Sequence, residues 1–70
     1  MATALRYNVR RLRTDMALRG WMAGDLARRA RVSDETVYRF IKSQTQTVRT
    51  AHKLAQALGY SVRRYLDVGR

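Results

Sequence analysis

Two short apolar-periodic segments, joined by only three residues, constrain the fold more than any other feature of the sequence. They lie within residues 23–42, AGDLARRARVSDETVYRFIK. Apolar residues follow helical spacing on both sides of the gap, with Leu26, Ala27 and Ala30 before it and Val37, Phe40 and Ile41 after it. Arg31, Val32 and Ser33 fill the gap, which leaves room only for a tight turn. The pattern predicts two helices that cross at a steep angle.

Helical periodicity continues along the rest of the chain. Proline is absent, and no alternating run of β-branched residues or Asn-Gly turn indicates a strand. Seventy residues suit one domain, near the lower size limit for a self-supporting core. We therefore predict an all-α fold, a compact five-helix domain that covers residues 1–70. Its helices are expected at 4–19, 22–30, 34–42, 48–58 and 62–67, with a loop at 43–47.

The first predicted helix has one apolar face, made by Leu5, Val9, Leu12 and Met16. Tyr7 and Leu18 fall on the other side of this helix, so we expect both side chains to be partly exposed. Asp15 lies four residues from both Arg11 and Arg19, a spacing that favours ion pairs along a helix.

The charge balance of the chain favours a polyanionic partner. Fifteen Lys and Arg residues stand against five Asp and Glu, for a formal net charge of +10. Nucleic acid is the first partner that this balance indicates, and an anionic membrane surface is the next. No apolar run approaches the roughly 20 residues of a membrane span, and no signal peptide is recognised. We therefore expect a cytoplasmic protein without membrane association.

Residues suited to catalysis or metal binding are nearly absent. The sequence has no cysteine, and its one histidine, His52, cannot build a metal site alone. It has no glycine-rich phosphate loop and no clustered carboxylate pair in a plausible cleft. We therefore expect neither enzyme activity nor a metal or cofactor, and we place His52 at the surface. The one tryptophan, Trp21, is expected to pack between helices.

The stretches DLARRARVSDETVYRFIK and TAHKLAQALGYSVRRYL resemble the phage-repressor, or Cro-type, helix-turn-helix family. The resemblance covers nearly the whole chain and implies a lambda-repressor-like domain with its helix-turn-helix at about 22–42. It also implies that the third helix, 34–42, enters the major groove of double-stranded DNA. The positions that match base-reading residues of the family are Asp34, Glu35, Thr36, Tyr38 and Arg39. The positions expected at phosphates are Ala23, Arg31, Ser33, Lys42, Ser43, Gln44 and Thr45.

The outward side of this third helix offers groups that fit base edges. Arg39 is the first candidate for sequence readout, because a guanidinium fits guanine O6 and N7 with two hydrogen bonds. Asp34 or Glu35 would accept from a cytosine amino group, and Thr36 would contact a thymine methyl. Tyr38 would bond a phosphate or pack against the protein. The alternative is that Asp34 and Glu35 only begin the helix and that Arg39 only pairs with Glu35.

Three features depart from the pattern of the family. Glycine usually stands where this chain has Arg31, in a left-handed turn in which another residue costs roughly 1 kcal/mol. Serine or threonine often caps the second helix, where this chain has Met22. The first helix also looks about one turn longer than in the family. We therefore expect strain at Arg31 and the loss of one capping interaction at Met22.

A single small helix-turn-helix makes few base contacts, so we expect a homodimer on two half-sites about one helical turn apart. Candidate dimer surfaces are the fifth helix, with Tyr65, Leu66 and Val68, or the back of the first helix, with Tyr7 and Leu18. The leading hypothesis is a sequence-specific transcriptional regulator, most simply a repressor. The alternatives are a DNA-binding antitoxin with a toxin partner, and a basic RNA-binding or membrane-surface helical protein.

Overall fold

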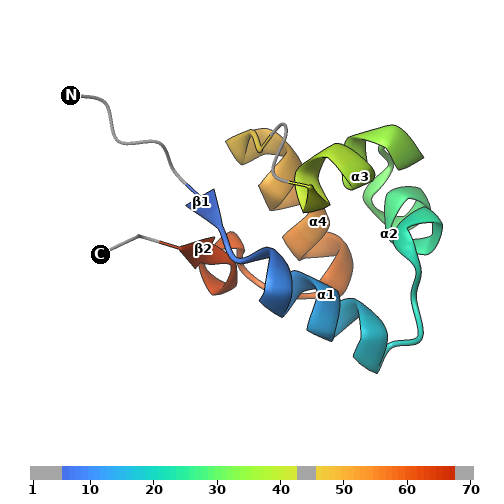
Figure 1. The fold of residues 1–70 in the computed structure, drawn as a ribbon, viewed down its shortest axis with the longest axis horizontal. Coiled ribbons are helices and arrows are strands. Elements are labelled where there is room, and N and C mark those ends of the chain that lie inside the picture. Colours follow the sequence, from blue (N-terminus) through green and yellow to red (C-terminus); the bar gives the residue numbers. More distant parts are fainter. Residues whose placement is uncertain (1–5, 43–45, 68–70) are drawn as a thin grey trace.

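The computed structural model describes residues 6–42 and 46–67. Within these ranges, four α-helices follow one another: α1 (Val9–Leu18), α2 (Ala23–Ala30), α3 (Asp34–Ile41) and α4 (Val48–Leu58). The chain continues into a 3-10 turn, η1 (Val62–Arg64), and two short strands flank the helices, β1 (Arg6–Tyr7) and β2 (Leu66–Asp67). Figure 1 shows the two strands together at one end of the molecule and α2 at the other end.

Helices α2 and α3 form the helix-turn-helix that the sequence predicts, with bounds within one residue of those expected. The α2 helix ends at Arg31, whose φ of 61° and ψ of 44° lie in the left-handed region. The Val32 N–H bonds to the Ala27 carbonyl at 3.0 Å and closes the turn. Ser33 caps α3, because its Oγ accepts a hydrogen bond from the Thr36 N–H at 3.1 Å. The predicted left-handed turn is therefore confirmed.

The core lies where α2, α3 and α4 meet, with α1 packed against it. Almost fully buried side chains come from all four helices, among them Leu12, Leu26, Phe40 and Leu54. Burying a side chain of this size stabilises a fold by roughly 1.5–3 kcal/mol. None of the helices in the described ranges has both the length and the apolar character that crossing a membrane requires.

The two strands correct the prediction that the chain has no β-structure. They pair antiparallel, with Arg6 opposite Asp67 and Tyr7 opposite Leu66. Each strand has two residues, too few to show the alternating pattern by which strands are recognised in a sequence. The pairing also joins opposite ends of the chain, so local patterns carry no sign of it.

The predictions for the first and last helices are wrong at the outer ends of the chain. The first helix begins at Val9 instead of residue 4, because the Asn8 side chain caps it by accepting from the Arg11 N–H at 2.9 Å. The extra first turn is therefore not part of α1, and Leu5 lies outside the described residues. The fifth helix predicted at 62–67 is a single 3-10 turn followed by β2.

Tyr7 and Tyr65, both named as candidate dimer residues, are buried. Strand β1 turns Tyr7 inward, where it is 6 % exposed and its ring centre lies 5.5 Å from that of Phe40. Tyr65 is 2 % exposed, because η1 carries it against α1. Both belong to the core, which corrects their assignment to dimer surfaces. Leu18 is 78 % exposed, so its predicted exposure is confirmed.

Asp15 is the one buried charged residue among those described. Its carboxylate accepts hydrogen bonds from Arg64 Nε at 2.7 Å, from Arg64 Nη2 at 3.0 Å and from the Tyr65 hydroxyl. These partners replace the predicted ion pairs with Arg11 and Arg19. The hydrogen bonds from Arg64 are the main cause that lowers the pKa of Asp15. The cluster ties α1 to η1 and so holds the two ends of the chain together.

Candidate nucleic-acid interface

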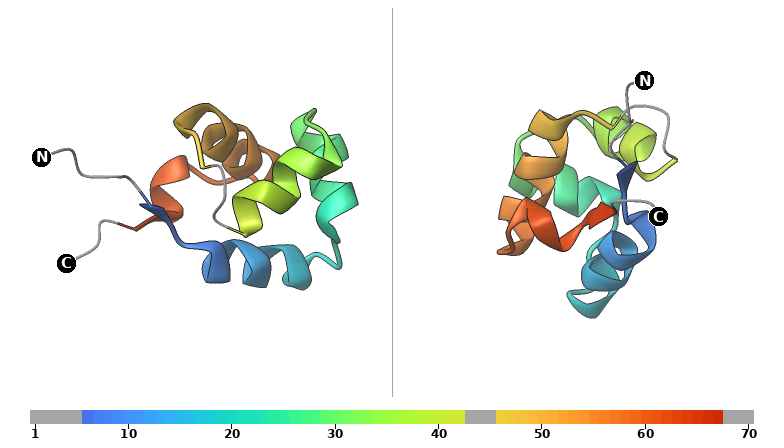
Figure 2. Two further views of the ribbon diagram at one scale, coloured as in Figure 1. Left: turned by 45° about the horizontal axis from the view of Figure 1, so that its top comes forward. Right: turned by 90° about the vertical axis from the view of Figure 1, so that its left-hand side faces the viewer.

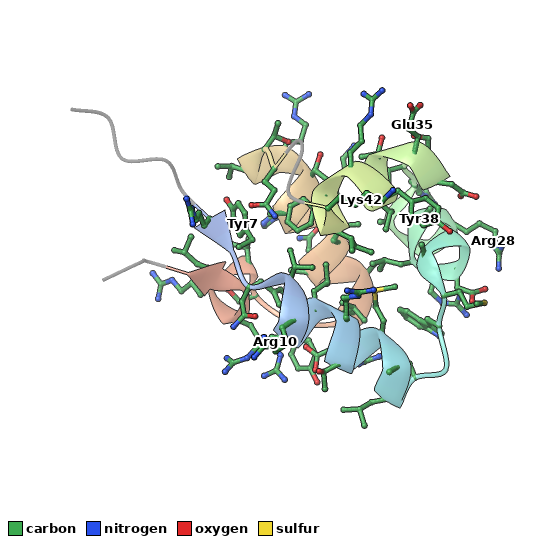
Figure 3. The ribbon with its side chains drawn as sticks, in the orientation of Figure 1. Tyr7, Arg10, Arg28, Glu35, Tyr38 and Lys42 are labelled. Atoms are coloured by element: carbon green, nitrogen blue, oxygen red, sulfur yellow. The ribbon has the colours of Figure 1, made fainter. Side chains whose placement is uncertain are left out.

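The α3 helix presents a polar face away from the core. Val37 and Phe40 point inward and are at most 1 % exposed. Figure 3 shows Glu35 at the outer edge of α3 and Tyr38 on the side of α3 that lies nearer α2. The structure places all five predicted base-reading residues on this helix, with Asp34, Glu35, Tyr38 and Arg39 exposed and Thr36 half-buried.

Two of the charged side chains on this face, Glu35 and Arg39, form an ion pair. Arg39 Nη2 lies 2.7 Å from Glu35 Oε2, and the two side chains are 55 % and 70 % exposed. An exposed pair at this spacing stabilises a helix by roughly 0.3–0.5 kcal/mol. A bidentate contact between arginine and guanine discriminates between bases by roughly 1–3 kcal/mol. The pair therefore orders Arg39 along the helix and is weak enough to open against a base.

The N-terminus of α2 has a weakened attraction for phosphate. Met22 precedes α2 and its side chain provides no cap, as expected. The Met22 N–H instead donates to Asp25 Oδ2 at 2.9 Å, and this bond is the main cause that lowers the pKa of Asp25. Arg28 Nη2 lies 2.6 Å from the other carboxylate oxygen. A carboxylate thus occupies the helix end near Ala23 where a phosphate was expected.

The other predicted phosphate contacts lie at the two ends of α3. Arg31 and Ser33 are exposed in the turn before it, and Lys42 is exposed just after its last residue. Ala23 is half-buried as the first residue of α2. Ser43, Gln44 and Thr45 lie outside the described residues.

A groove beside α3 is a feature that the sequence did not indicate. It has a volume of about 570 Å³ and lies between α1, the start of α2 and α3. Trp21 lines it while packing against the core, so its predicted packing role is confirmed. Met22 and Tyr38 are the exposed large hydrophobic residues along it, at 77 % and 52 %. The groove opens next to the base-reading face, because Tyr38 belongs to both.

Arginines and aromatic rings alternate along a stack that joins α2 to η1. The guanidinium carbons of Arg29 and Arg19 lie 4.2 and 5.6 Å from the centre of the Trp21 ring. Those of Arg19 and Arg64 lie 5.3 and 4.1 Å from the centre of the Tyr60 ring. Contacts of this type contribute roughly 0.5–1 kcal/mol each at exposed sites. Sequence reasoning missed the stack because its members come from distant parts of the chain.

Within the described ranges, no three His, Cys, Asp or Glu side chains are grouped so that they could hold a metal ion.

Comparison with known proteins agrees with the geometry of α2 and α3. No curated protein and no solved structure matched the sequence. The profile of the helix-turn-helix family matches residues 9–65, most of the 70-residue chain. The chain therefore belongs to the Cro/C1-type helix-turn-helix family of DNA-binding regulators.

Proposed function

We propose that the protein is a sequence-specific transcriptional regulator that binds double-stranded DNA by placing α3 in the major groove. The observation that carries this proposal is the exposed polar face of α3, mounted on the buried Val37 and Phe40. A base-reading helix needs a rigid mount, because small displacements break hydrogen bonds to bases. The simplest regulatory outcome is repression, in which the bound protein occludes a promoter.

Glu35 and Arg39 act as one reading unit in this proposal. Opening their 2.7 Å pair frees Arg39 for guanine O6 and N7 and leaves Glu35 to accept from a cytosine amino group. On a sequence that lacks these partners, the Glu35 carboxylate repels phosphates without compensation. Specificity then rests on rejection of wrong sites as well as on attraction to the right one. Thr36 and Tyr38 flank the unit. Thr36 would contact a thymine methyl, and Tyr38 would bond a phosphate.

Phosphate contacts around α3 supply most of the affinity. We assign them to Arg31 and Ser33 before the helix and to Lys42 after it, with Ala23 at the start of α2. Because Asp25 neutralises part of the α2 N-terminus, the contacts next to α3 carry the larger share. Binding that depends on such contacts weakens steeply as salt is added.

We propose that two copies bind two half-sites about 34 Å apart, one helical turn of DNA. One domain of this size makes too few base contacts for specific binding on its own. With Tyr7 and Tyr65 in the core, the surfaces left for the dimer contact are the exposed Leu18 and the half-buried Leu66. Val68, the remaining candidate, lies outside the described residues.

The test begins with selection of preferred duplexes from a random pool, followed by titration of the selected duplex and of a scrambled one. Arg39→Ala should weaken binding to the selected duplex by roughly 1–3 kcal/mol and affect the scrambled duplex much less. Lys53→Ala is the matched control, because Lys53 is an exposed cation on α4 and should affect both duplexes equally. Equal losses on both duplexes for Arg39→Ala would contradict base readout by this residue.

RNA hairpins and anionic vesicles test the alternative partners. Both are titrated at the same salt concentration as the selected duplex, because every electrostatic contact weakens with salt. Tighter binding of the protein to either of them than to the selected duplex would overturn the proposal.

A further inference from the structure

Helix α1 carries more net positive charge than the proposed reading helix. The α3 helix carries two acidic residues and one arginine, whereas α1 carries three arginines and one acidic residue. That acidic residue is Asp15, which is already bound to Arg64 through two hydrogen bonds. Arg13 of α1 lines the groove beside α3, whereas the function proposed for α3 assigns no role to Arg10 and Arg11.

A shallow hollow of about 330 Å³ gathers three arginines beside α1 and η1. Arg10, Arg11 and Arg64 line this arginine hollow together with the polar side chains of Asn8 and Thr14. Arg10 and Arg11 are exposed, and neither forms an ion pair with another described residue. Two cations in the hollow are thus available to an anion from outside.

The carboxylate that lines the arginine hollow does not offset these two cations. Asp15 is 1 % exposed and bound by Arg64 and the Tyr65 hydroxyl, so its charge is already matched by that of Arg64. The Arg64 guanidinium is fixed by this pair and by the Tyr60 ring, whose centre lies 4.1 Å away. A guanidinium that is already ordered loses little conformational freedom when an anion binds next to it.

The arginine hollow lies on the opposite side of the molecule from the reading face. Figure 3 shows Arg10 and Glu35 at opposite edges, and the right-hand view of Figure 2 shows α1 at the bottom and α3 at the top. The two shorter dimensions of the molecule are 21 and 17 Å. DNA stays nearly straight over lengths far below its persistence length of roughly 150 base pairs. A duplex bound to α3 therefore cannot bend around to the hollow.

We propose that the arginine hollow binds the phosphate backbone of a second DNA segment, so that the protein bridges two duplexes. The forked donors of arginine fit phosphate oxygens, and phosphate contacts need no particular base sequence. A membrane surface fits less well, because only Leu18 among the residues that line the hollow is a large exposed hydrophobic, and membrane binding needs a larger apolar face. The bridge goes beyond the proposed function, which serves here only to place the first duplex.

The first experiment counts the binding sites by calorimetric titration with a short duplex of the selected sequence and a scrambled one. The wild-type protein should show one class of sites that prefers the selected sequence and a second class that does not. The double variant Arg10→Ala/Arg11→Ala should keep the first class and lose the second. Arg39→Ala should keep the second class and lose the sequence preference of the first.

The second experiment measures the bridge itself. The selected duplex is fixed to beads, loaded with protein and exposed to a fluorescent duplex of unrelated sequence. For equal protein loading, Arg10→Ala/Arg11→Ala should retain about tenfold less fluorescent duplex than wild type, because two phosphate contacts are lost. Arg49→Ala/Lys53→Ala removes the same charge from exposed positions on α4 and should retain as much as wild type. Thermal melting of both variants checks that they are folded.

The outcomes separate the bridge from the proposed function. Equal retention by the two double variants would overturn the bridge, because dimers or net charge would then explain it. Preference of the DNA-loaded protein for anionic vesicles over the second duplex would overturn it in favour of a membrane surface. If the wild-type protein lacks the sequence-preferring class and shows only the sequence-independent one, the proposed function is contradicted and the arginine hollow stays supported. If the wild-type protein lacks only the sequence-independent class, the bridge is contradicted and the proposed function stays supported.

Discussion

The helix-turn-helix and the region where the chain ends meet are held together in different ways. In α2 and α3, hydrogen bonds between residues close in sequence close the turn and cap the helices. For example, the Thr36 N–H donates to Ser33 Oγ, three residues earlier. In the other region, the Asp15 carboxylate binds partners 49 and 50 residues away, and β1 pairs with β2. A change in the first region acts on the core that mounts α3. A change in the second acts on how the chain ends are fastened to that core.

The two regions also differ in charge, and we propose a different role in DNA binding for each of them. The reading face carries acidic residues beside Arg39, which suits discrimination between sequences. The arginine hollow carries two cations without ion-pair partners among the described residues, which suits contact with any phosphate backbone. One small domain thus separates sequence reading from general attraction to DNA.

The largest effect should come from the core beneath α3. Leu26→Ala should lower the free energy of unfolding by roughly 2–5 kcal/mol, because Leu26 is fully buried between α2 and its neighbours. Urea unfolding followed by the fluorescence of Trp21 measures this change. Leu18→Ala makes the same substitution at a residue that is 78 % exposed, and it should change stability by less than about 0.5 kcal/mol. Similar values for the two variants would refute the core assignment.

Asp15→Asn should give the next largest loss of stability, and this loss should be concentrated where the chain ends meet. Hydrogen bonds to a charged group contribute roughly 1.5–3 kcal/mol, so we expect a loss of about 2 kcal/mol of stability. The loss should open the chain ends first, seen as faster hydrogen exchange of the Asn8 amide, which donates to the Tyr65 carbonyl. Asp34→Asn, at an exposed position, is the control. Uniform acceleration of exchange throughout α2 and α3 would show that the two regions are not separable.

The acid sensitivity of the protein should report on the same cluster. The pKa of Asp15 in the folded protein is lowered by Arg64, below the usual value of about 3.9 for an unfolded chain. The unfolded state therefore takes up the proton first, so the stability from this group is complete above about pH 4 and is lost as the pH falls further. Urea midpoints at pH 5, 4 and 3 should fall more for wild type than for Asp15→Asn. Parallel curves would contradict the assigned role of the carboxylate.

The smallest effect should come from the turn of the helix-turn-helix. Arg31→Gly should raise the free energy of unfolding by about 0.5–1 kcal/mol, because glycine adopts the left-handed conformation without strain. Arg31→Ala removes the same side chain but keeps the strain, so it should show no such gain. A gain of equal size for both variants would mean that the arginine side chain, rather than the backbone, was unfavourable.

How much of each region could be predicted depends on whether its contacts are local or distant in sequence. The spacing of Leu26, Val37 and Phe40, with the Ser33 cap, predicted α2 and α3 because every signal lies close in sequence. The same reasoning from helical spacing placed Tyr7 at the surface, because it assumed a helix where β1 pairs with β2 near the other end of the chain.

The candidate interface shows the same limit. The residues on the outer side of α3 could be read from the sequence, and so could the alternative in which Arg39 pairs with Glu35. Two other features depend on three-dimensional contacts and could not be read from the sequence. They are the hydrogen bond from the Met22 N–H to the Asp25 carboxylate and the groove beside α3. The arginine hollow could not be predicted, because Arg64 reaches α1 only in the folded chain.

Amide chemical shifts of the labelled protein, followed while the selected duplex is added, test most directly whether α3 reads DNA. We predict that the first equivalent of duplex moves the signals of residues 31–42, and that a scrambled duplex moves them much less. The signals of Arg10 and Arg11 should move only as further duplex is added. If the first equivalent gave its largest shifts on α1 and left α3 unchanged, DNA reading by α3 would be contradicted.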